Sequence, residues 1–106
     1  MNNLKVKINN KDLTIGSWLS LGDLSITEIM VNCSSFEWLV IDMEHTSISL
    51  KQAENMMRII EMGGKVPFVR VGENDPLIIK RVLDCGAQGI IVPMVNTKEE
   101  AEKAVN

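Results

Sequence analysis

The sequence lacks a cluster of basic residues and a long apolar run. Its 11 lysines and arginines are outnumbered by 14 aspartates and glutamates, and the formal net charge is −3. The chain therefore has no excess of basic residues of the kind that nucleic-acid-binding domains carry. It also has no run of basic residues that would bind an anionic membrane surface. The longest apolar stretches have the length of strands, whereas a membrane helix needs about 20 consecutive apolar residues. We therefore expect neither a nucleic acid nor a membrane as partner.

Paired cysteines and a secretion signal are also missing. Cys33 and Cys85 are far apart and belong to no CxxC motif, so a disulfide or a metal site built on them is not expected. The first twelve residues, MNNLKVKINNKD, contain no apolar signal core. These features predict a cytoplasmic protein with two reduced thiols.

Apolar strand-like runs alternate with segments of helical period. The 106 residues, 45% of them hydrophobic, suffice for one core and predict a single domain over residues 1–106. The pattern repeats as four strand–helix units. The predicted strands span 14–21, 38–43, 65–71 and 89–95, and the predicted helices 25–32, 49–62, 76–85 and 99–105.

Start signals precede all four predicted helices. They are the capping boxes Ser25-x-x-Glu28, Ser49-x-x-Gln52 and Thr97-x-x-Glu100, and the Asp75–Pro76 pair. Gly63–Gly64 and Gly86 supply stop signals. The spacing of apolar residues predicts which side chains each helix buries. These are Ile26, Ile29, Met30 and Cys33 in the first helix, Leu50, Ala53, Met57 and Ile60 in the second, and Leu77, Ile78, Val82 and Cys85 in the third. Methionines 56, 57 and 62 are expected to serve helix packing rather than a cofactor site.

Alternating strands and helices predict a parallel sheet with right-handed crossovers. An open nucleotide-binding sheet would carry a glycine-rich turn after its first strand, and the corresponding SLGDLS has a single glycine. Polar residues at the ends of several strands favour a (β/α)8 barrel, whose strand ends carry the active site. A complete barrel takes about 250 residues. The prediction is therefore an α/β half-barrel, the first four βα units of a TIM barrel.

Ionisable residues follow two neighbouring strands. Asp42, Glu44 and His45 lie at the end of the second predicted strand, and Arg70 lies at the end of the third. The carboxyl ends of parallel strands meet at one rim, and alternation puts Val40, Asp42 and Glu44 on a common face. Two acids, an imidazole and a guanidinium in one concavity are suited to proton transfer and anion binding.

Each of these four residues also has a structural interpretation. The imidazole could cap a carbonyl group of its loop. The guanidinium could form an ordinary ion pair with either acid, and the acids could bind amides of the following turn. By residue type alone, Trp18 could be plain core and Asp84 a solvated surface acid. The residue types leave both interpretations open.

The sequence resembles the HpcH/HpaI aldolase family of metal-dependent, class II pyruvate aldolases. The resemblance covers nearly the whole chain from Gly16 onward. It is carried by the segments GSWLSLGD, FEWLVIDMEH, VPFVRV, NDPLIIKRVLDCGAQGIIVPMV and NTKEEAEKAV. It implies a TIM barrel and a lyase that reversibly cleaves a 2-keto-3-deoxy sugar acid or another 4-hydroxy-2-oxo acid to pyruvate and an aldehyde.

The resemblance also implies roles for individual residues. Arg70 would contact the keto acid and support its developing oxyanion, and His45 would transfer protons. Asp84 would pair with that histidine, and Asp42 would lie in the same catalytic pocket. Trp18 would border the substrate channel, and Glu44 would act at the substrate site or behind it.

The family uses a divalent metal, Mg, Mn or Co, as a Lewis acid. The resemblance places its ligands, a Glu and an Asp, on later strands beyond Asn106. We therefore expect these 106 residues alone to bind metal weakly or not at all and to show negligible turnover. Either two copies pair as a homo-oligomer, or the chain is part of a longer product that supplies the second half-barrel.

Two other functions compete with this expectation. One is a carbon–carbon lyase acting on a CoA thioester, as in the citrate lyase β-subunit branch. The DMEH motif favours the aldolase branch, and no basic surface for CoA is evident. The other is a non-catalytic half-barrel that serves as an assembly module.

Overall fold

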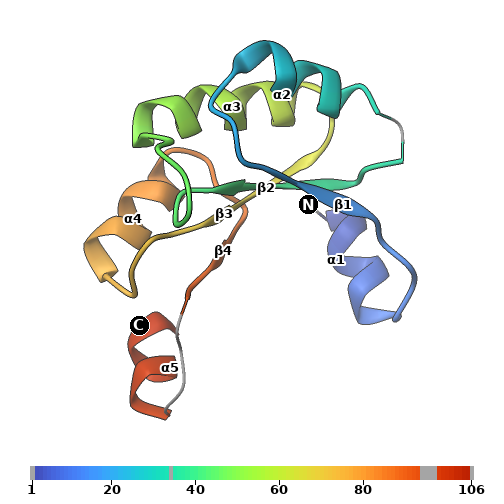
Figure 1. The fold of residues 1–106 in the computed structure, drawn as a ribbon. Helices are drawn as coiled ribbons and strands as arrows, with labels where there is room; N and C mark the ends of the chain where they lie inside the picture. The colour runs from blue at the N-terminus through green and yellow to red at the C-terminus, as the bar shows by residue number, and fades with distance from the viewer. Residues whose placement is uncertain (1, 34, 94–97, 106) are drawn as a thin grey trace.

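The computed structural model describes residues 2–33, 35–93 and 98–105 as alternating helices and strands (Figure 1). One helix precedes four strand–helix units. In chain order these are α1 (Asn2–Asn9), β1 (Gly16–Leu19), α2 (Leu24–Val31), β2 (Trp38–Asp42), α3 (Leu50–Met62), β3 (Val66–Arg70), α4 (Pro76–Asp84), β4 (Gly89–Ile91) and α5 (Lys98–Val105).

The four strands form one parallel sheet in the order β1-β2-β3-β4. Each strand pairs with the next one in the chain, so every connection is a crossover that contains a helix. The predicted α/β class with a parallel sheet is confirmed. None of the described helices is long and apolar enough to cross a membrane.

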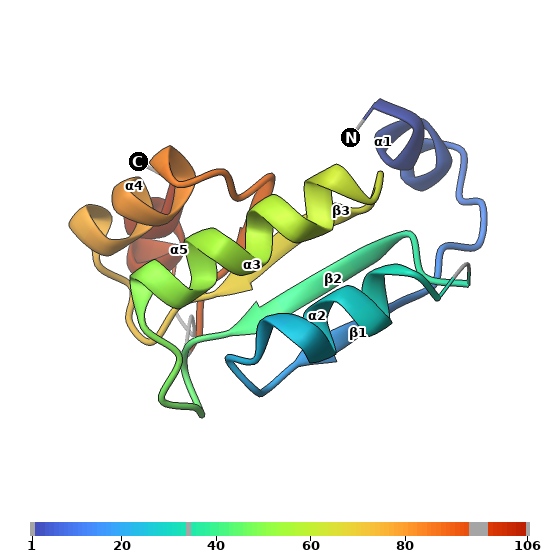
Figure 2. The same ribbon diagram turned by 90° about the horizontal axis from the view of Figure 1, so that it is seen from above.

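Helices α2 and α3 cover one face of the sheet, as two perpendicular views show (Figures 1 and 2). Leu39 and Ile41 project from β2 into this layer because side chains alternate along a strand. They join Val69 of β3 in a buried cluster with one face of α3, made of Ala53, Met56, Met57 and Ile60. The hydrophobic core therefore lies between the sheet and its helices.

The alternate side chains of each strand project from the opposite face of the sheet. Here Trp38, Val40 and Phe68 border a groove of about 390 Å³ that we call the inner groove. Its lining is Leu4, Ile8, Thr14, Trp18, Trp38, Val40, Phe68, Gly89, Ile90 and Ile91. Helix α1 lies on this side of the sheet, away from α2 and α3 (Figure 1). The inner groove is the apolar concavity below the rim where β2 and β3 end.

Two glycines make room for the aromatic rings of the inner groove. Gly16 pairs with Trp38, and a Cβ at Gly16 would lie 1.9 Å from the indole Cδ2. Gly89 pairs with Phe68, and a Cβ there would lie 2.7 Å from the ring Cδ1. Both distances are far below van der Waals contact. The rings of Trp38 and Phe68, 6.1 Å apart, therefore lie across glycine positions of the neighbouring strands.

Two of the predicted helix starts are confirmed. Ser49 and Gln52 form a complete capping box at the start of α3. The carboxylate of Asp75 accepts a hydrogen bond from the amide of Leu77, with Pro76 as the first residue of α4. The third expected box, at Thr97, lies outside the described residues, as does the end of the last predicted strand.

The predictions for α2 need correction. Its N-cap is Asp23, whose carboxylate accepts hydrogen bonds from the amides of Ser25 and Ile26, so the capping box predicted at Ser25 is wrong. The buried residues are Thr27 and Val31. Ile29 is 68% exposed and Cys33 is exposed, contrary to prediction. The helix is rotated so that its buried stripe includes a threonine, whose hydroxyl group donates to the Asp23 carbonyl.

Two further residues for which packing is predicted are exposed. Met62, in the last turn of α3, is 87% exposed, and Leu77, in the first turn of α4, is 55% exposed. Both lie in the terminal turn of a helix. Helix α1 was not predicted at all. Leu4 of α1 is buried, and Lys7 forms an ion pair with Glu37 at 3.0 Å.

Candidate active site

The candidate site is built around an ion pair between the ends of two neighbouring strands. Asp42 ends β2, Arg70 ends β3, and the two residues are partners in the parallel register. Arg70 donates from Nε to Oδ1 of Asp42 at 3.1 Å and from Nη2 to Oδ2 at 2.6 Å. This two-pronged geometry fixes the plane of the guanidinium group. The predicted meeting of these residues at one rim is observed.

The carboxylate of Asp42 also organises the turn that follows β2. Its Oδ1 accepts hydrogen bonds from the amides of Glu44 at 2.9 Å and His45 at 3.2 Å. The hydroxyl group of Thr46 donates to the carbonyl oxygen of Asp42. An aspartate that binds the amides two and three residues later is a common way to set a turn. The turn therefore presents Glu44 and His45 from a fixed backbone.

Hydrogen bonds from Arg70 are the main reason that the pKa of Asp42 is lowered. Burial of the carboxyl group opposes this effect, and the amides of His45 and Glu44 add to it. In return, the hydrogen bonds to Asp42 raise the pKa of Arg70. Both groups are thus held in their charged forms. The structural roles left open for Asp42 and Arg70, ion pairing and amide binding, are both realised.

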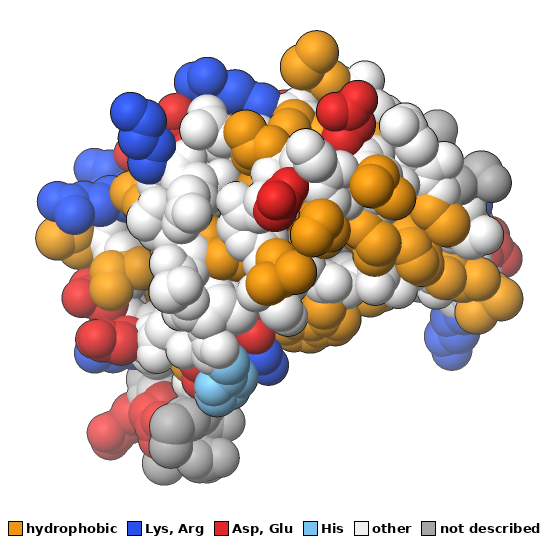
Figure 3. Space-filling model, turned by 45° about the horizontal axis from the view of Figure 1, so that its top comes forward, with side chains coloured by type: hydrophobic (Ala, Val, Ile, Leu, Met, Phe, Trp, Pro, Cys, Tyr) orange, Lys and Arg blue, Asp and Glu red, His pale blue; other side chains and the backbone are white. Residues whose placement is uncertain are grey.

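Glu44 links this ion pair to the histidine. Its Oε1 lies 3.3 Å from Nε of Arg70 and 3.1 Å from Nε2 of His45. The side chain of Glu44 is 17% exposed, whereas that of His45 is 68% exposed. Figure 3 shows the pale-blue histidine at the surface beside acidic and basic side chains. One carboxylate oxygen therefore contacts both the guanidinium and the imidazole.

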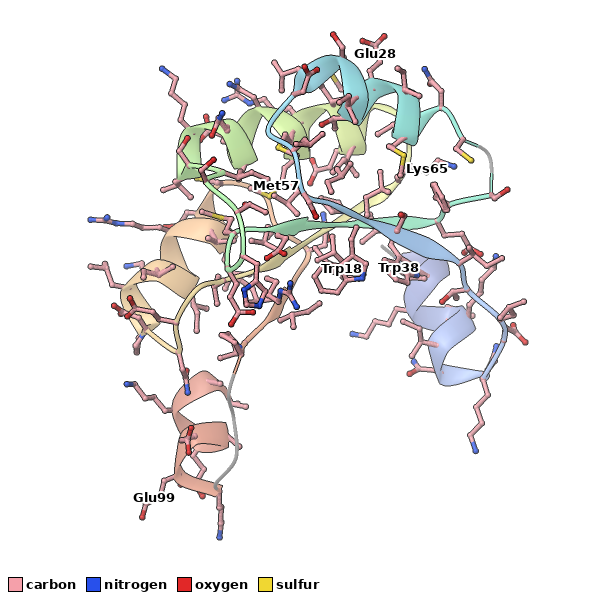
Figure 4. All side chains as sticks on the ribbon, viewed as in Figure 1. Trp18, Glu28, Trp38, Met57, Lys65 and Glu99 are labelled. Carbon is pink, nitrogen blue, oxygen red and sulfur yellow. The ribbon has the colours of Figure 1, made fainter. Side chains whose placement is uncertain are left out.

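Trp18 of β1 covers Arg70 of β3, although β2 lies between these two strands in the sheet. The Cζ atom of Arg70 lies 4.4 Å from the centroid of the indole ring, a distance suited to a cation–π contact. Figure 4 shows Trp18 and Trp38 on the side of the sheet where α1 lies. Trp18 is 41% exposed, so the alternative that it is plain core is wrong. Its ring forms the wall between the inner groove and the charged rim.

The structure places Asp84 away from the other predicted site residues. Asp84 is the last residue of α4 and is exposed. Helix α4 begins just after the rim and runs antiparallel to the strands. Its last residue therefore lies toward the amino ends of the strands, away from the rim. Among the described residues, no hydrogen bond or ion pair joins Asp84 to His45. The pairing implied by the resemblance is not seen among the described residues and stays a prediction; Oε1 of Glu44 lies near the imidazole.

The residues of this rim do not fit a divalent metal. Both oxygens of Asp42 are engaged by Arg70, and Oε1 of Glu44 is shared between Arg70 and His45. A metal ion bound by these acids would have to lie beside a permanently charged guanidinium group. Within the described part of the chain, no three His, Cys, Asp or Glu residues are grouped to hold a metal. The rim instead offers a cation and an imidazole to an anionic ligand.

Thr46 and the contact between Glu44 and His45 had no place in the sequence-based prediction. A threonine four residues after Asp42 could have indicated a hydroxyl cap for the turn. The contact between adjacent side chains depends on their rotamers, for which the sequence carries no direct signal.

Known proteins resemble this chain over nearly all of its length. The family model for HpcH/HpaI aldolase/citrate lyase matches residues 14–106. A 5-keto-4-deoxy-D-glucarate aldolase of Escherichia coli is 38% identical over 104 residues, which is 98% of this chain and 40% of that protein. A 2-dehydro-3,6-dideoxy-6-sulfogluconate aldolase of Pseudomonas putida is 34% identical over 99 residues, 93% of this chain and 38% of the relative.

Solved structures show the same similarity. An HpcH/HpaI aldolase/citrate lyase family protein from Burkholderia cenocepacia J2315 superposes with a TM-score of 0.88 at 33% identity, over 99% of this chain and 42% of that one. The citrate synthase SbnG also gives a TM-score of 0.88, at 36% identity, over 96% of this chain and 41% of the other. The chain thus spans about two fifths of the length of these proteins.

Proposed function

Because the chain belongs to the HpcH/HpaI aldolase/citrate lyase family, we propose that it supplies the arginine and histidine side of an aldolase active site. The reaction is the reversible cleavage of a 2-keto-3-deoxy sugar acid, or another 4-hydroxy-2-oxo acid, to pyruvate and an aldehyde. The observation that carries this proposal is the rim where Arg70, fixed by Asp42, lies beside Glu44 and His45.

Arg70 is the proposed binding group for the oxoacid. A guanidinium group presents five N–H donors, and Asp42 accepts hydrogen bonds from Nε and Nη2, while Glu44 forms an ion pair with the group. The remaining donors can bind the carboxylate or the oxygen that gains negative charge as the enolate forms. Trp18 stacks on the guanidinium and borders the path of the substrate. Asp42 has a positioning role, since it holds the arginine rather than the ligand.

His45 is the proposed proton-transfer residue. In the cleavage direction a base accepts the proton of the C4 hydroxyl group and the C3–C4 bond breaks. The hydroxyl carbon becomes the carbonyl carbon of the aldehyde, and the electron pair of the broken bond forms the enolate of pyruvate. Protonation of that enolate at C3 gives pyruvate. Imidazole is a side-chain group suited to both accepting and donating protons in general acid–base catalysis.

We further propose that the four strand–helix units are half of a TIM barrel. The single parallel sheet, the rim at the strand ends and the open inner groove support this proposal. A second half-barrel, either from a longer chain or from another copy, would cover the groove. The family also implies a divalent metal such as Mg, Mn or Co, and its ligands would have to lie outside the rim acids described above.

An aldol assay tests the proposed function. Pyruvate and glycolaldehyde, or a semialdehyde, are incubated with Mn²⁺ or Mg²⁺ and either this chain or a longer gene product that contains it. We expect activity from the longer product, loss of that activity with EDTA, and a decrease in kcat of about 10²- to 10⁴-fold in His45→Ala. Lys98→Ala, an exposed change on α5, is the control variant.

The outcomes of this assay separate the candidate functions. Activity that survives EDTA would overturn the metal dependence, and unchanged activity in His45→Ala would overturn the role of the histidine. Turnover with a CoA thioester and no turnover with pyruvate and an aldehyde would favour the CoA-dependent branch. Inactivity of both the chain and the longer product toward all these substrates would favour the non-catalytic half-barrel.

A further inference from the structure

We propose that Asn74 is a positioning residue that holds α5 in place. Its side-chain amide joins two segments that follow different strands, the connection after β3 and the first turn of α5. The contact itself is a property of this chain. Its consequence for a barrel, given below, rests on the proposed half-barrel.

Helix α5 has little of its own to keep it folded. It has eight residues, whereas isolated helices shorter than about 12–15 residues are marginal in water. The structure describes all of residues 98–105, and none of them is buried. Glu99 and Glu100 in the first turn and Lys103 in the last suit the helix dipole, but such effects are weak at exposed positions. Helix α5 therefore depends on contacts with the rest of the chain.

Two residues on one side of α5 are partly covered by the rest of the chain. Glu100 and Ala104 are half-buried, and a spacing of four residues puts them on the same face of the helix. Helix α5 lies beside α4 (Figure 1), and Ala104 lines a groove of about 390 Å³ between the two helices together with Ile79 and Leu83. A groove of this size shows that the apolar side chains of α4 and α5 do not fill the space between them.

Asn74 makes its contact on this same face of α5. Its Nδ2 donates to the carbonyl oxygen of Glu100 at 2.8 Å. A carbonyl oxygen has two lone pairs, so it can accept this bond as well as one within the helix. The donor is firmly supported, because the next residue, Asp75, caps α4 by accepting from the amide of Leu77 at 2.9 Å. The side chain of Asn74 therefore ties α5 to the start of α4.

The second polar atom of the same amide group has no such partner. Oδ1 of Asn74 is buried and accepts no hydrogen bond within the described part of the chain. A buried acceptor without a donor is unfavourable. Exchanging the two amide atoms would not help, since it would place Oδ1 against the carbonyl oxygen of Glu100. The bond to α5 therefore explains the orientation of this side chain.

This arrangement separates a local clasp from a general structural role. Replacing Asn74 removes the bond to α5 but also removes an unsatisfied acceptor, so the stability of the core should change little. Helix α5, which depends on outside contacts, should loosen. In the proposed half-barrel the chain would continue from α5 to a fifth strand beside β4. Asn74 would then set the place from which the second half of the barrel begins.

NMR on this chain tests the proposal. Asn74→Asp keeps the shape of the side chain but has no donor for the Glu100 carbonyl at pH 7, and Asn74→Ala removes the donor without adding a charge. In both variants we expect the amides of residues 102–105 to exchange about fivefold faster, the effect of one hydrogen bond. The Cα shifts of residues 98–105 should move toward random-coil values. Asn10→Ala, at an exposed position after α1, is the matched control and should change neither quantity.

The stability of the core is measured on the same variants. The urea midpoint, followed by the fluorescence of Trp18 and Trp38, should be the same in Asn74→Ala and the wild type. Unchanged exchange and shifts of α5 in both variants, or random-coil shifts for residues 98–105 in the wild type, would overturn the inference. A loss of core stability as large as the loss in α5 would also overturn it. None of these measurements requires turnover, so this inference and the aldolase function can fail independently.

Discussion

Asp42 and Arg70 are direct partners in the register of β2 and β3, and each ends its strand. The ion pair between them has two contacts, of 3.1 and 2.6 Å, and lies at the rim where the paired parts of β2 and β3 end. Since Asp42 also binds two amides of the next turn, one carboxylate sets both the guanidinium and the loop that carries His45. Loss of this carboxylate should affect stability and the site together.

The first prediction concerns the acid stability of the fold. Because the pKa of Asp42 is lowered below its ordinary value of 3.8 in the folded chain, the unfolded chain binds the proton more readily. The stabilising contribution of the ion pair is complete above the ordinary value and is lost as the pH falls through the folded-state value. Urea unfolding can be followed by circular dichroism between pH 7 and pH 2. As the pH falls, the free energy of unfolding should decrease less steeply for Asp42→Asn than for the wild type.

At pH 7 the same variant should be less stable than the wild type, because Arg70 loses its charged partner. Asp12→Asn, at an exposed position, is the control and should follow the wild-type curve. Parallel curves for Asp42→Asn and the wild type over the whole pH range would contradict the role assigned to this ion pair.

A second prediction compares two methionines of α3. Met56 is fully buried between the helix and the sheet, whereas Met62 is 87% exposed. Met56→Ala should lower the free energy of unfolding by about 2–5 kcal/mol, since it removes buried methylene groups and leaves a cavity. Met62→Ala should change it by no more than about 0.5 kcal/mol. Equal effects in urea denaturation would contradict the placement of the core.

The third prediction distinguishes the two residues that could cap α2. Asp23 accepts hydrogen bonds from two amides of the first turn, at 2.7 and 3.1 Å. Asp23→Ala should therefore destabilise the protein by about 1 kcal/mol. Ser25→Ala, two residues later, should have an effect within about 0.5 kcal/mol. If thermal unfolding ranks these variants in the opposite order, the predicted capping box at Ser25 is restored.

The fourth prediction addresses the open inner groove. If two copies of the chain cover each other's groove, light scattering should show a mass that rises with protein concentration. Ile91→Lys, at the edge of the groove on β4, should suppress this rise. Ile29→Lys places the same charge on the helical layer and should not. A monomer at all concentrations, or suppression by Ile29→Lys alone, would contradict association through the groove.

The strands and two of the helix starts could be predicted because their signals are local. The run from Trp38 to Asp42 is apolar until its last residue, and Ser49 and Asp75 are followed by the residues that complete their caps. Helix α1 has no such signal. Its polar sequence is held by long-range contacts, through the burial of Leu4 and the ion pair of Lys7.

Errors arose where two local signals compete. Asp23 and Ser25 are both good N-cap residues, and only the position of the chain after β1 decides between them. In the folded chain Thr27 of α2 is buried and Ile29 is exposed. A periodic pattern gives the spacing of a buried stripe, but tertiary contacts decide which of two adjacent stripes is buried.

At the candidate site, topology alone predicts part of the arrangement. Parallel strands bring their carboxyl ends together, so the meeting of Asp42 with Arg70 follows from the order of elements. The pairing of Asp84 with His45 that the resemblance implies is not seen among the described residues and stays a prediction. The contact between Glu44 and His45 depends on side-chain torsions, and these are set by Arg70 on another strand.

The sheet order β1-β2-β3-β4, identical to the order along the chain, has a consequence for biosynthesis. When a new strand leaves the ribosome, the strand that it pairs with has already been synthesised. The sheet can therefore form strand by strand from the amino end. Pairing between consecutive units closes shorter loops than pairing between distant strands would. Throughout this growth the most recent strand has an unpaired edge, which is the site most exposed to aggregation until the next strand is added.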